Sequence, residues 1–230
     1  MYQDTAVFLG PTITTADVVA VLPGATIYPP IKCGDIMQLV YARSDIKIIA
    51  IIDGFFEHTA SVWHKEILLA LSKGIKVLGA SSMGALRAAE LHLFGMQGVG
   101  QIFDLYRQNH LEDDDEVAVL HYGAELAFQS NSDAMINIRA TLKRALVESI
   151  LTQSQVEHLS KVLKNTFYAN RNLLTAAQSL LTEQSFLLFS AWLEGGAIDL
   201  KHQDAKQLLT VIRAHQCAKL SLKFDLNTSL

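Results

Sequence analysis

The first 130 residues repeat one pattern, in which a short run of β-branched and aliphatic residues is followed by a longer amphipathic segment. Such runs are typical of buried strands in a parallel sheet whose faces are covered by the intervening helices. Four strands and a candidate fifth are predicted, in chain order at 6–10, 25–28, 47–52, 76–80 and 117–121. We therefore expect an α/β fold, a small parallel sheet with flanking helices of the Rossmann-like or flavodoxin-like type.

Helix signals lie between these strands. Three helices are predicted, at 16–22, 36–43 and 62–72. Side chains that favour N-caps precede two of them, because Thr14 or Thr15 stands before the first and Ser61 before the third. The local signals thus agree with a β-α-β succession.

The second part of the chain has no strand signals. Apolar stripes predict five helices there, at 134–151, 155–166, 173–181, 186–193 and 203–220. Charge also differs between the parts, since residues 1–130 sum to −7 and residues 131–230 to +3. We therefore predict two regions, an α/β core at 1–130 and an all-helical region at 131–230 packed on it.

Composition excludes several function classes. No basic face interleaved with aromatics is present, and the acidic first part would repel nucleic acid. The longest apolar runs, 48–52 and 186–193, are far shorter than the roughly 18 residues of a membrane span. The first residues lack the features of a secretory signal, so a cytoplasmic protein is expected. Two cysteines, no H-E-x-x-H motif and no P-loop motif argue against a metal or nucleotide site.

Ligands of an open parallel sheet bind at the carboxyl ends of its strands. Gly10 ends the first predicted strand, Asp53 and Gly54 follow the third, and Ser81 and Ser82 follow the fourth. These turns should meet at one edge of the sheet, which makes that edge the first place to look for chemistry.

The turn after the fourth strand resembles a nucleophile elbow centred on Ser82. Ala80 and Gly84 fill the small-residue positions two before and two after this serine. The backbone N–H of Met83 would then face an oxyanion, with Ser81 lining the cleft. The alternative is that Ser81 and Ser82 only cap the following helix.

A nucleophilic serine needs a base, and His64 and Lys65 are the candidates at this edge, with Asp53 as an orienting group. Equally, His64 could be a packed histidine at a helix start, and Asp53 could stabilise a turn. Both alternatives stay open at this point.

Two arginines are candidates for binding an anionic substrate. Arg87 could reach into the cleft or pair with Glu90 three residues on, and Arg139 on an apolar helix needs a carboxylate from the protein or from a ligand. The acidic run 112–116 lacks the spacing of a cation loop, so a solvated loop is expected. Cys33 beside Lys32 is a secondary candidate for a reactive thiolate, and Cys217 is predicted to pack in its helix.

Several blocks of this sequence resemble the TfuA-like core domain. The most specific are Trp63-His64-Lys65-Glu66 and Ser81-Ser82-Met83-Gly84-Ala85-Leu86-Arg87. Further blocks are Val7-Phe8-Leu9-Gly10-Pro11, Ile51-Ile52-Asp53-Gly54-Phe55-Phe56 and Asn137-Ile138-Arg139-Ala140-Thr141-Leu142. Together they span about residues 6 to 142.

The resemblance implies a partner of YcaO-type enzymes, which activate a peptide amide with ATP so that sulfur replaces its oxygen. A TfuA-like protein is expected to hydrolyse the thiocarboxylate of a ThiS-like, ubiquitin-fold sulfur carrier and to deliver sulfide, with no cofactor of its own. Ser82 and the Met83 N–H would serve this acyl chemistry, His64 or Lys65 would move the proton, Asp53 would orient, and Arg87 or Arg139 would hold the carrier. Beyond these partners, the helical region could bind another copy of the chain, giving a homo-oligomer.

Two other interpretations remain. The chain could be a non-catalytic adaptor that recruits or activates a YcaO partner. It could also be an unrelated serine hydrolase, in which His92, His110 or His121 would complete the triad.

Overall fold

The computed structural model describes residues 2–56 and 59–227, except for the side chains of 216–227, among which Cys217 falls. The chain forms two compact units, one made of Met1–Arg107 with His202–Leu230 and the other of Gln108–Lys201. The units thus divide the chain after residues 107 and 201, whereas the sequence placed one boundary near residue 130. Each unit is described by itself below.

The first unit contains a five-stranded sheet in which every pairing is parallel. Its order is β2-β1-β3-β4-β5, which is the flavodoxin-like arrangement. The strands are β1 (Thr5–Phe8), β2 (Thr26–Tyr28), β3 (Ile48–Ile51), β4 (Lys76–Ala80) and β5 (Gln97–Val99). The predicted α/β class and parallel sheet are therefore confirmed.

The fifth strand is not the predicted one. β5 lies at Gln97–Val99, whereas 117–121 belongs to the second unit and contributes only an isolated bridge from His121 to Ser130. β5 has three residues with Gly98 at its centre, so it lacks a run of apolar side chains of the kind by which the other strands were predicted.

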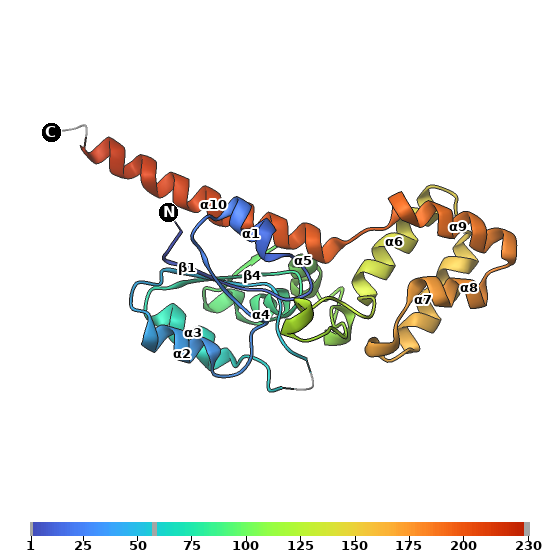
Figure 1. Cartoon of the computed structure of the whole chain (residues 1–230), viewed down its shortest axis with the longest axis horizontal. Helices are drawn as coiled ribbons and strands as arrows, with labels where there is room; N and C mark the ends of the chain where they lie inside the picture. Colours follow the sequence, from blue (N-terminus) through green and yellow to red (C-terminus); the bar gives the residue numbers. More distant parts are fainter. Residues whose placement is uncertain (1, 57–58, 228–230) are drawn as a thin grey trace. The chain divides into compact units, whose positions relative to one another are not determined.

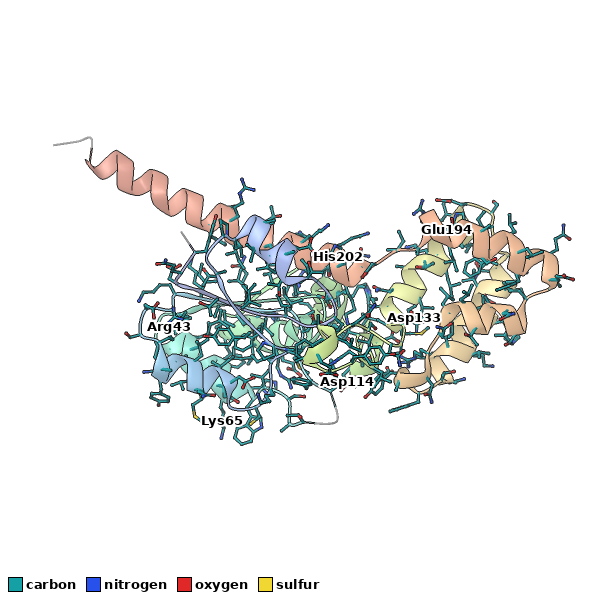
Figure 2. All side chains as sticks on the ribbon, in the orientation of Figure 1. Arg43, Lys65, Asp114, Asp133, Glu194 and His202 are labelled. Carbon is teal, nitrogen blue, oxygen red and sulfur yellow. The ribbon has the colours of Figure 1, made fainter. Side chains whose placement is uncertain are left out.

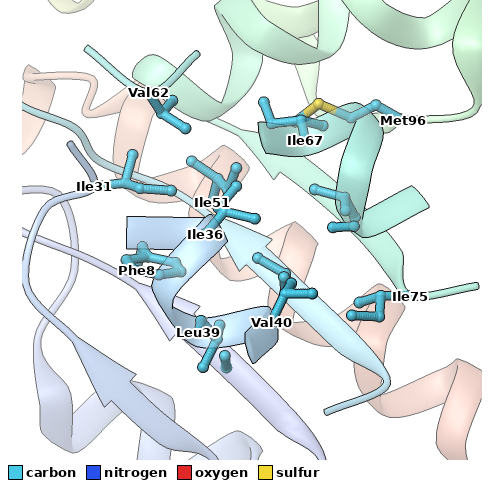
Figure 3. Close-up of a cluster of buried hydrophobic side chains, with 14 of the residues drawn as sticks. Phe8, Ile31, Ile36, Leu39, Val40, Ile51, Val62, Ile67, Ile75 and Met96 are labelled. Carbon is cyan, nitrogen blue, oxygen red and sulfur yellow. The ribbon is translucent and has the colours of Figure 1, made fainter. Parts of the chain in front are cut away.

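Helices cover both faces of this sheet (Figure 1). The first unit's helices are α1 (Thr15–Val21), α2 (Asp35–Ala42), α3 (His64–Ser72), α4 (Met83–Leu91), α5 (Gln101–Arg107) and most of α10 (Leu200–Asn227). Successive strand residues point to opposite faces, so Ile49 and Ile51 pack with α2, α3 and α4, while Ala50 and Ile52 pack with α1 and α10. Figure 3 shows the first of these clusters, built around side chains such as Phe8, Ile36 and Ile67.

Helix α3 begins two residues later than predicted. Its N-cap is Trp63, because the buried Glu66 carboxylate accepts a bond from the Trp63 backbone N–H at 3.4 Å. The hydroxyl of Ser61 instead donates to the Phe55 carbonyl at 3.3 Å, so Ser61 does not cap this helix. Thr14 does cap α1 as expected, through a reciprocal pair of bonds with Asp17.

The second unit is helical. Its longer helices are α6 (Met135–Val147), α7 (Gln153–Asn165), α8 (Leu173–Leu180) and α9 (Glu183–Gly196), and its single turns are η2 (Asp114–Glu116), η3 (Ala124–Leu126) and η4 (Tyr168–Asn170). Their apolar stripes meet in one cluster that includes Leu142, Leu159 and Phe189. Within the described part of the chain, no helix has the length and apolar character needed to cross a membrane.

Candidate functional site

The site begins at the place where the strand order of the sheet reverses. β1 lies between β2 and β3, so the chain leaves β1 toward one side and leaves β3 toward the other. Ligands of doubly wound sheets bind at such a switch point, outside the carboxyl ends of the strands. Here the residues at that point are Gly10 and Thr12, which follow β1, and Asp53, which follows β3.

Asp53 joins the two strand ends. Its side chain is buried, and Oδ2 accepts hydrogen bonds from the backbone N–H of Gly10 at 2.9 Å and of Thr12 at 3.1 Å. Oδ1 accepts a third bond from the Thr12 hydroxyl at 2.6 Å. Gly10 must lack a side chain here, because a Cβ would lie 2.6 Å from Cγ of Pro30 and 3.2 Å from Cβ of Asp53. The two predicted residues Gly10 and Asp53 are thus in direct contact.

Both serines of the predicted elbow lie at this edge, and both are buried, with exposed fractions of 0% for Ser81 and 2% for Ser82. The left-handed residue of the turn is Ser81, with φ of 69°, and Ser82 has φ of −109°. A non-glycine residue in that region carries strain of about 1–3 kcal/mol, which nucleophile elbows also store. The strained position is therefore one residue before the one singled out in the sequence.

The hydroxyl of Ser81 also connects to the aspartate. It donates to Oγ1 of Thr12 at 3.5 Å, and Thr12 in turn donates to Asp53. Ser82 is the N-cap residue of α4, but its side chain makes no capping hydrogen bond. Neither serine side chain therefore acts as a simple helix cap.

The start of α4 is pressed against the sheet. A Cβ at Gly84 would overlap the Ile51 carbonyl group, and one at Gly54 would lie 2.7 Å from Cγ of Met83. Met83 is the first residue of α4, so its N–H belongs to the turn that has no intrahelical acceptors. Two more predicted residues, Gly54 and Met83, are therefore adjacent at the edge that carries the serines.

His64 lies in a second group of side chains. Its Nε2 is 2.7 Å from Oε2 of Glu90, and the same oxygen accepts from Nη1 of Arg87 at 2.8 Å. Arg87 also donates through Nε to the Val62 carbonyl at 3.0 Å. Glu90 lies eight residues after Ser82, about 12 Å farther along the helix axis. In this structure His64 therefore bonds to Glu90 and not to a serine, and the intrahelical alternative for Arg87 is the one that forms.

Lys65 is exposed and extends from the outer side of α3 (Figure 2). Cys33 is not set up as a reactive thiolate, because burial and the neighbouring Glu66 raise the pKa of its thiol. No group of three or more metal-ligating side chains is found in the parts of the chain that the structure describes.

Arg139 belongs to the second unit and finds its carboxylate within the protein. Its Nε and Nη2 donate to the two oxygens of Glu116, each at 2.9 Å. Three residues of the acidic run are also paired by cations of this unit, since Lys164 bonds to Asp113, Asp115 and Glu116, and the buried Arg171 bonds to Asp115. The expectation of a solvated acidic loop therefore agrees with the exposed residues 112–114, but it was wrong for Asp115 and Glu116, which are held in an ion-pair network.

Burial would raise the pKa of Asp115, but the hydrogen bonds from Lys164 and Arg171 outweigh it and lower that pKa. The hydrogen bond with Glu116 raises the pKa of Arg139. Both shifts keep the network charged, as a structural ion-pair cluster requires.

Two residues of the switch-point site were not singled out from the sequence. Thr12 carries the hydroxyl between Ser81 and Asp53, and His202, at the start of α10 (Figure 2), lies with Nδ1 3.0 Å from the Thr12 carbonyl oxygen. A signal for Thr12 is present in the sequence, since it lies two residues after Gly10 in the loop that follows the first strand. His202 had none, because it comes 190 residues later in a helix.

Comparison with known proteins gives one family. The family model described as TfuA-like protein matches residues 53–172, which is more than half of the chain. The matched stretch includes Asp53, both serines, His64 and Arg139, whereas Thr12 and His202 lie outside it. No curated protein matches the chain. On the strength of the family match, this chain belongs to the TfuA-like protein family, which is associated with YcaO partners.

Proposed function

We propose that this protein hydrolyses the thiocarboxylate of a ThiS-type sulfur carrier and delivers the sulfide to a YcaO partner, which uses ATP to activate a peptide amide. The observation that carries the proposal is the buried chain of hydrogen bonds from Ser81 through Thr12 to Asp53, at the switch point and beside the start of α4. Acyl chemistry needs a polar group held in place next to a donor for an oxyanion, and this edge has both.

The reaction balances without any further reagent. An oxygen nucleophile attacks the thiocarboxylate carbon, the carbon–sulfur bond breaks, and sulfur leaves as HS⁻. If a serine attacks, its proton ends on the departing sulfur and an acyl ester forms. Water then hydrolyses the ester to a carboxylate, releasing one proton and restoring the serine. Direct attack by water gives the same products.

The residues divide these tasks as follows. Ser82 or Ser81 provides the hydroxyl, and the Met83 N–H with the dipole of α4 stabilises the oxyanion. Asp53 holds the loop after β1 against the end of β3 and accepts from Thr12, which in turn accepts from the Ser81 hydroxyl. His64 and Lys65 remain candidate proton carriers, of which His64 would first have to leave Glu90.

Arginine side chains are candidates for binding the carrier's anionic tail. Arg87 and Arg139 would each exchange a protein carboxylate for that tail, Glu90 in one case and Glu116 in the other. An arginine suits this task because its planar guanidinium binds a carboxylate through two parallel hydrogen bonds.

The test is sulfide release from a purified thiocarboxylated ThiS-type carrier, with and without a YcaO partner and ATP. The variants are Ser81→Ala, Ser82→Ala and His64→Ala, and Ser72→Ala is the matched control, since Ser72 is an exposed serine at the end of α3. Release that is lost on changing a site serine and kept in the Ser72 variant supports the proposal. No release under any condition refutes it.

A second function, the non-catalytic adaptor, is favoured by one specific observation. Both serines are buried, and His64, one of the two candidate bases, is bonded to Glu90 instead of to a serine. An adaptor would bind a YcaO partner and raise its activity even with Ser81→Ala and Ser82→Ala, while releasing no sulfide. Measuring partner affinity and thioamide formation with these variants separates the two functions.

A further inference from the structure

Helix α10 brings a histidine to the switch point from the far end of the chain. Nδ1 of His202 lies 3.0 Å from the carbonyl oxygen of Thr12. A carbonyl oxygen can only accept, so Nδ1 must carry the hydrogen and donate. The imidazole therefore holds Thr12 by its backbone carbonyl, whereas Asp53 holds its N–H and its hydroxyl.

Thr12 is consequently fixed at three of its polar atoms. Its N–H and its hydroxyl both donate to Asp53, at 3.1 and 2.6 Å, and its carbonyl accepts from His202. Because the hydroxyl hydrogen is committed to Asp53, only lone pairs of Oγ1 remain to face Ser81, which donates to that atom. The orientation of Thr12 thus decides which way the Ser81 hydroxyl points.

The first turns of α10, which carry His202, are held in place by contacts that do not involve the imidazole. Asp204, two residues further on, accepts from the backbone N–H of Gln101 at 2.9 Å and of Ile102 at 2.8 Å, at the start of α5. Next to it, Ala205 and Leu208 are fully buried in the apolar cluster on this face of the sheet. Removing the imidazole should therefore leave α10 in place and take the Nδ1 donor away from the Thr12 carbonyl.

We propose that His202 is a positioning residue of the switch-point site, which acts through Thr12 to keep the Ser81 hydroxyl oriented. As a contribution to catalysis, this inference rests on the proposed sulfide-releasing function. The geometric part, that the imidazole orders Thr12 and the bonds of the strand-end loop to Asp53, is testable without any activity.

The test compares His202→Leu with His202→Asn in the full chain. A leucine removes the donor, whereas the amide nitrogen of an asparagine can take the place of Nδ1 and restore it. Hydrogen exchange is followed at the backbone amides of Gly10 and Thr12, which donate to Asp53. Misplacing a reacting group by about 1 Å can lower a rate about 100-fold, so sulfide release should fall about 10- to 100-fold in the leucine variant and be largely restored in the asparagine variant.

The amides of Gln101 and Ile102 are the internal control, because they report whether α10 stays docked. We expect the leucine variant to lose protection at Gly10 and Thr12 alone, and the asparagine variant to keep it. Unchanged protection in the leucine variant would overturn the inference. So would loss at Gln101 and Ile102 as well, since the imidazole would then hold the helix and not Thr12.

Activity adds an independent outcome. If the asparagine variant keeps its amides protected but releases sulfide as poorly as the leucine variant, the imidazole does more than position, and the inference is overturned. If the unchanged protein releases no sulfide, the proposed function fails, while the amide pattern still decides whether His202 orders the loop.

Discussion

Replacing Asp53 by asparagine should reverse the direction of the two hydrogen bonds of the Thr12 hydroxyl while leaving the fold in place. An amide oxygen at the position of Oδ2 can still accept from the backbone N–H groups of Gly10 and Thr12. The amide nitrogen, at the position of Oδ1, can only donate, so the Thr12 hydroxyl has to accept from it. That hydroxyl then donates toward Ser81, the opposite of its present role.

The magnitudes separate this change from a simple loss of contacts. Asp53→Ala leaves three buried donors without an acceptor, at about 1–3 kcal/mol each, so a loss of roughly 3–9 kcal/mol in the free energy of unfolding is expected. Asp53→Asn keeps all three contacts and loses only their charge-assisted strength, which is partly offset because no charge is buried. Its expected cost is about 1–2 kcal/mol.

The assay is urea denaturation followed by fluorescence of Trp63 in a Trp192→Phe background, so that the signal comes from the first unit. Under the proposed function, sulfide release should fall about 100-fold in Asp53→Asn, in line with loss of one well-placed polar group in a catalytic site. Equal destabilisation by Asp53→Asn and Asp53→Ala would refute the geometric reasoning. Full release by Asp53→Asn would refute the role of the hydroxyl chain.

Three further predictions concern stability. Gly84→Ala should destabilise the first unit by about 3 kcal/mol or more, because the new Cβ would overlap the backbone of β3. Gly195→Ala in α9 should instead stabilise the second unit by about 0.5–1 kcal/mol, because its Cβ would have no atom within 4 Å. Urea midpoints that shift in the same direction for both variants would contradict this prediction. Because the pKa of Asp115 is lowered in the folded protein, the ionised carboxylate adds to the free energy of unfolding above about pH 4, and this stabilisation is lost as the pH falls. Asp115→Asn should therefore make the free energy of unfolding depend less on pH in the acid range. An unchanged slope of stability against pH would count against this prediction. Arg171→Met should cost the second unit about 3–5 kcal/mol, since it leaves the Asp115 charge short of a partner, and a thermal melt unaffected by the change would exclude that role.

Most of the sheet could be predicted because four of its strands have a recognisable residue pattern. β1 to β4 are rich in apolar and β-branched residues, and each lies within one or two residues of its predicted place. β5 could not be predicted, since Gln97-Gly98-Val99 has no such run and is a strand only because β4 pairs with it. Likewise, the apolar stripe of residues 203–220 predicted a helix, but the stripe alone does not show that this helix packs on the sheet of the first unit.

The site was predictable to the extent that it depends on strand ends. Parallel strands bring their carboxyl ends together, so the proximity of Gly10, Asp53 and the serines follows from the topology. The partner of His64 did not follow, because Glu90 is 26 residues away and helix packing decides which side chains meet. A local motif likewise cannot show whether a left-handed backbone falls at Ser81 or at Ser82.

Because α10 packs on the sheet of the first unit, the first unit cannot finish folding until the end of the chain has been synthesised. Its buried residues, including Ala205 and Leu208, cover the sheet face that carries Val7 and Ala50, yet they are translated only after the whole second unit. The second unit is one continuous stretch and can fold as soon as it has been made. Until then α1 covers only part of this sheet face, so the side chains that α10 will bury stay uncovered while the second unit is made.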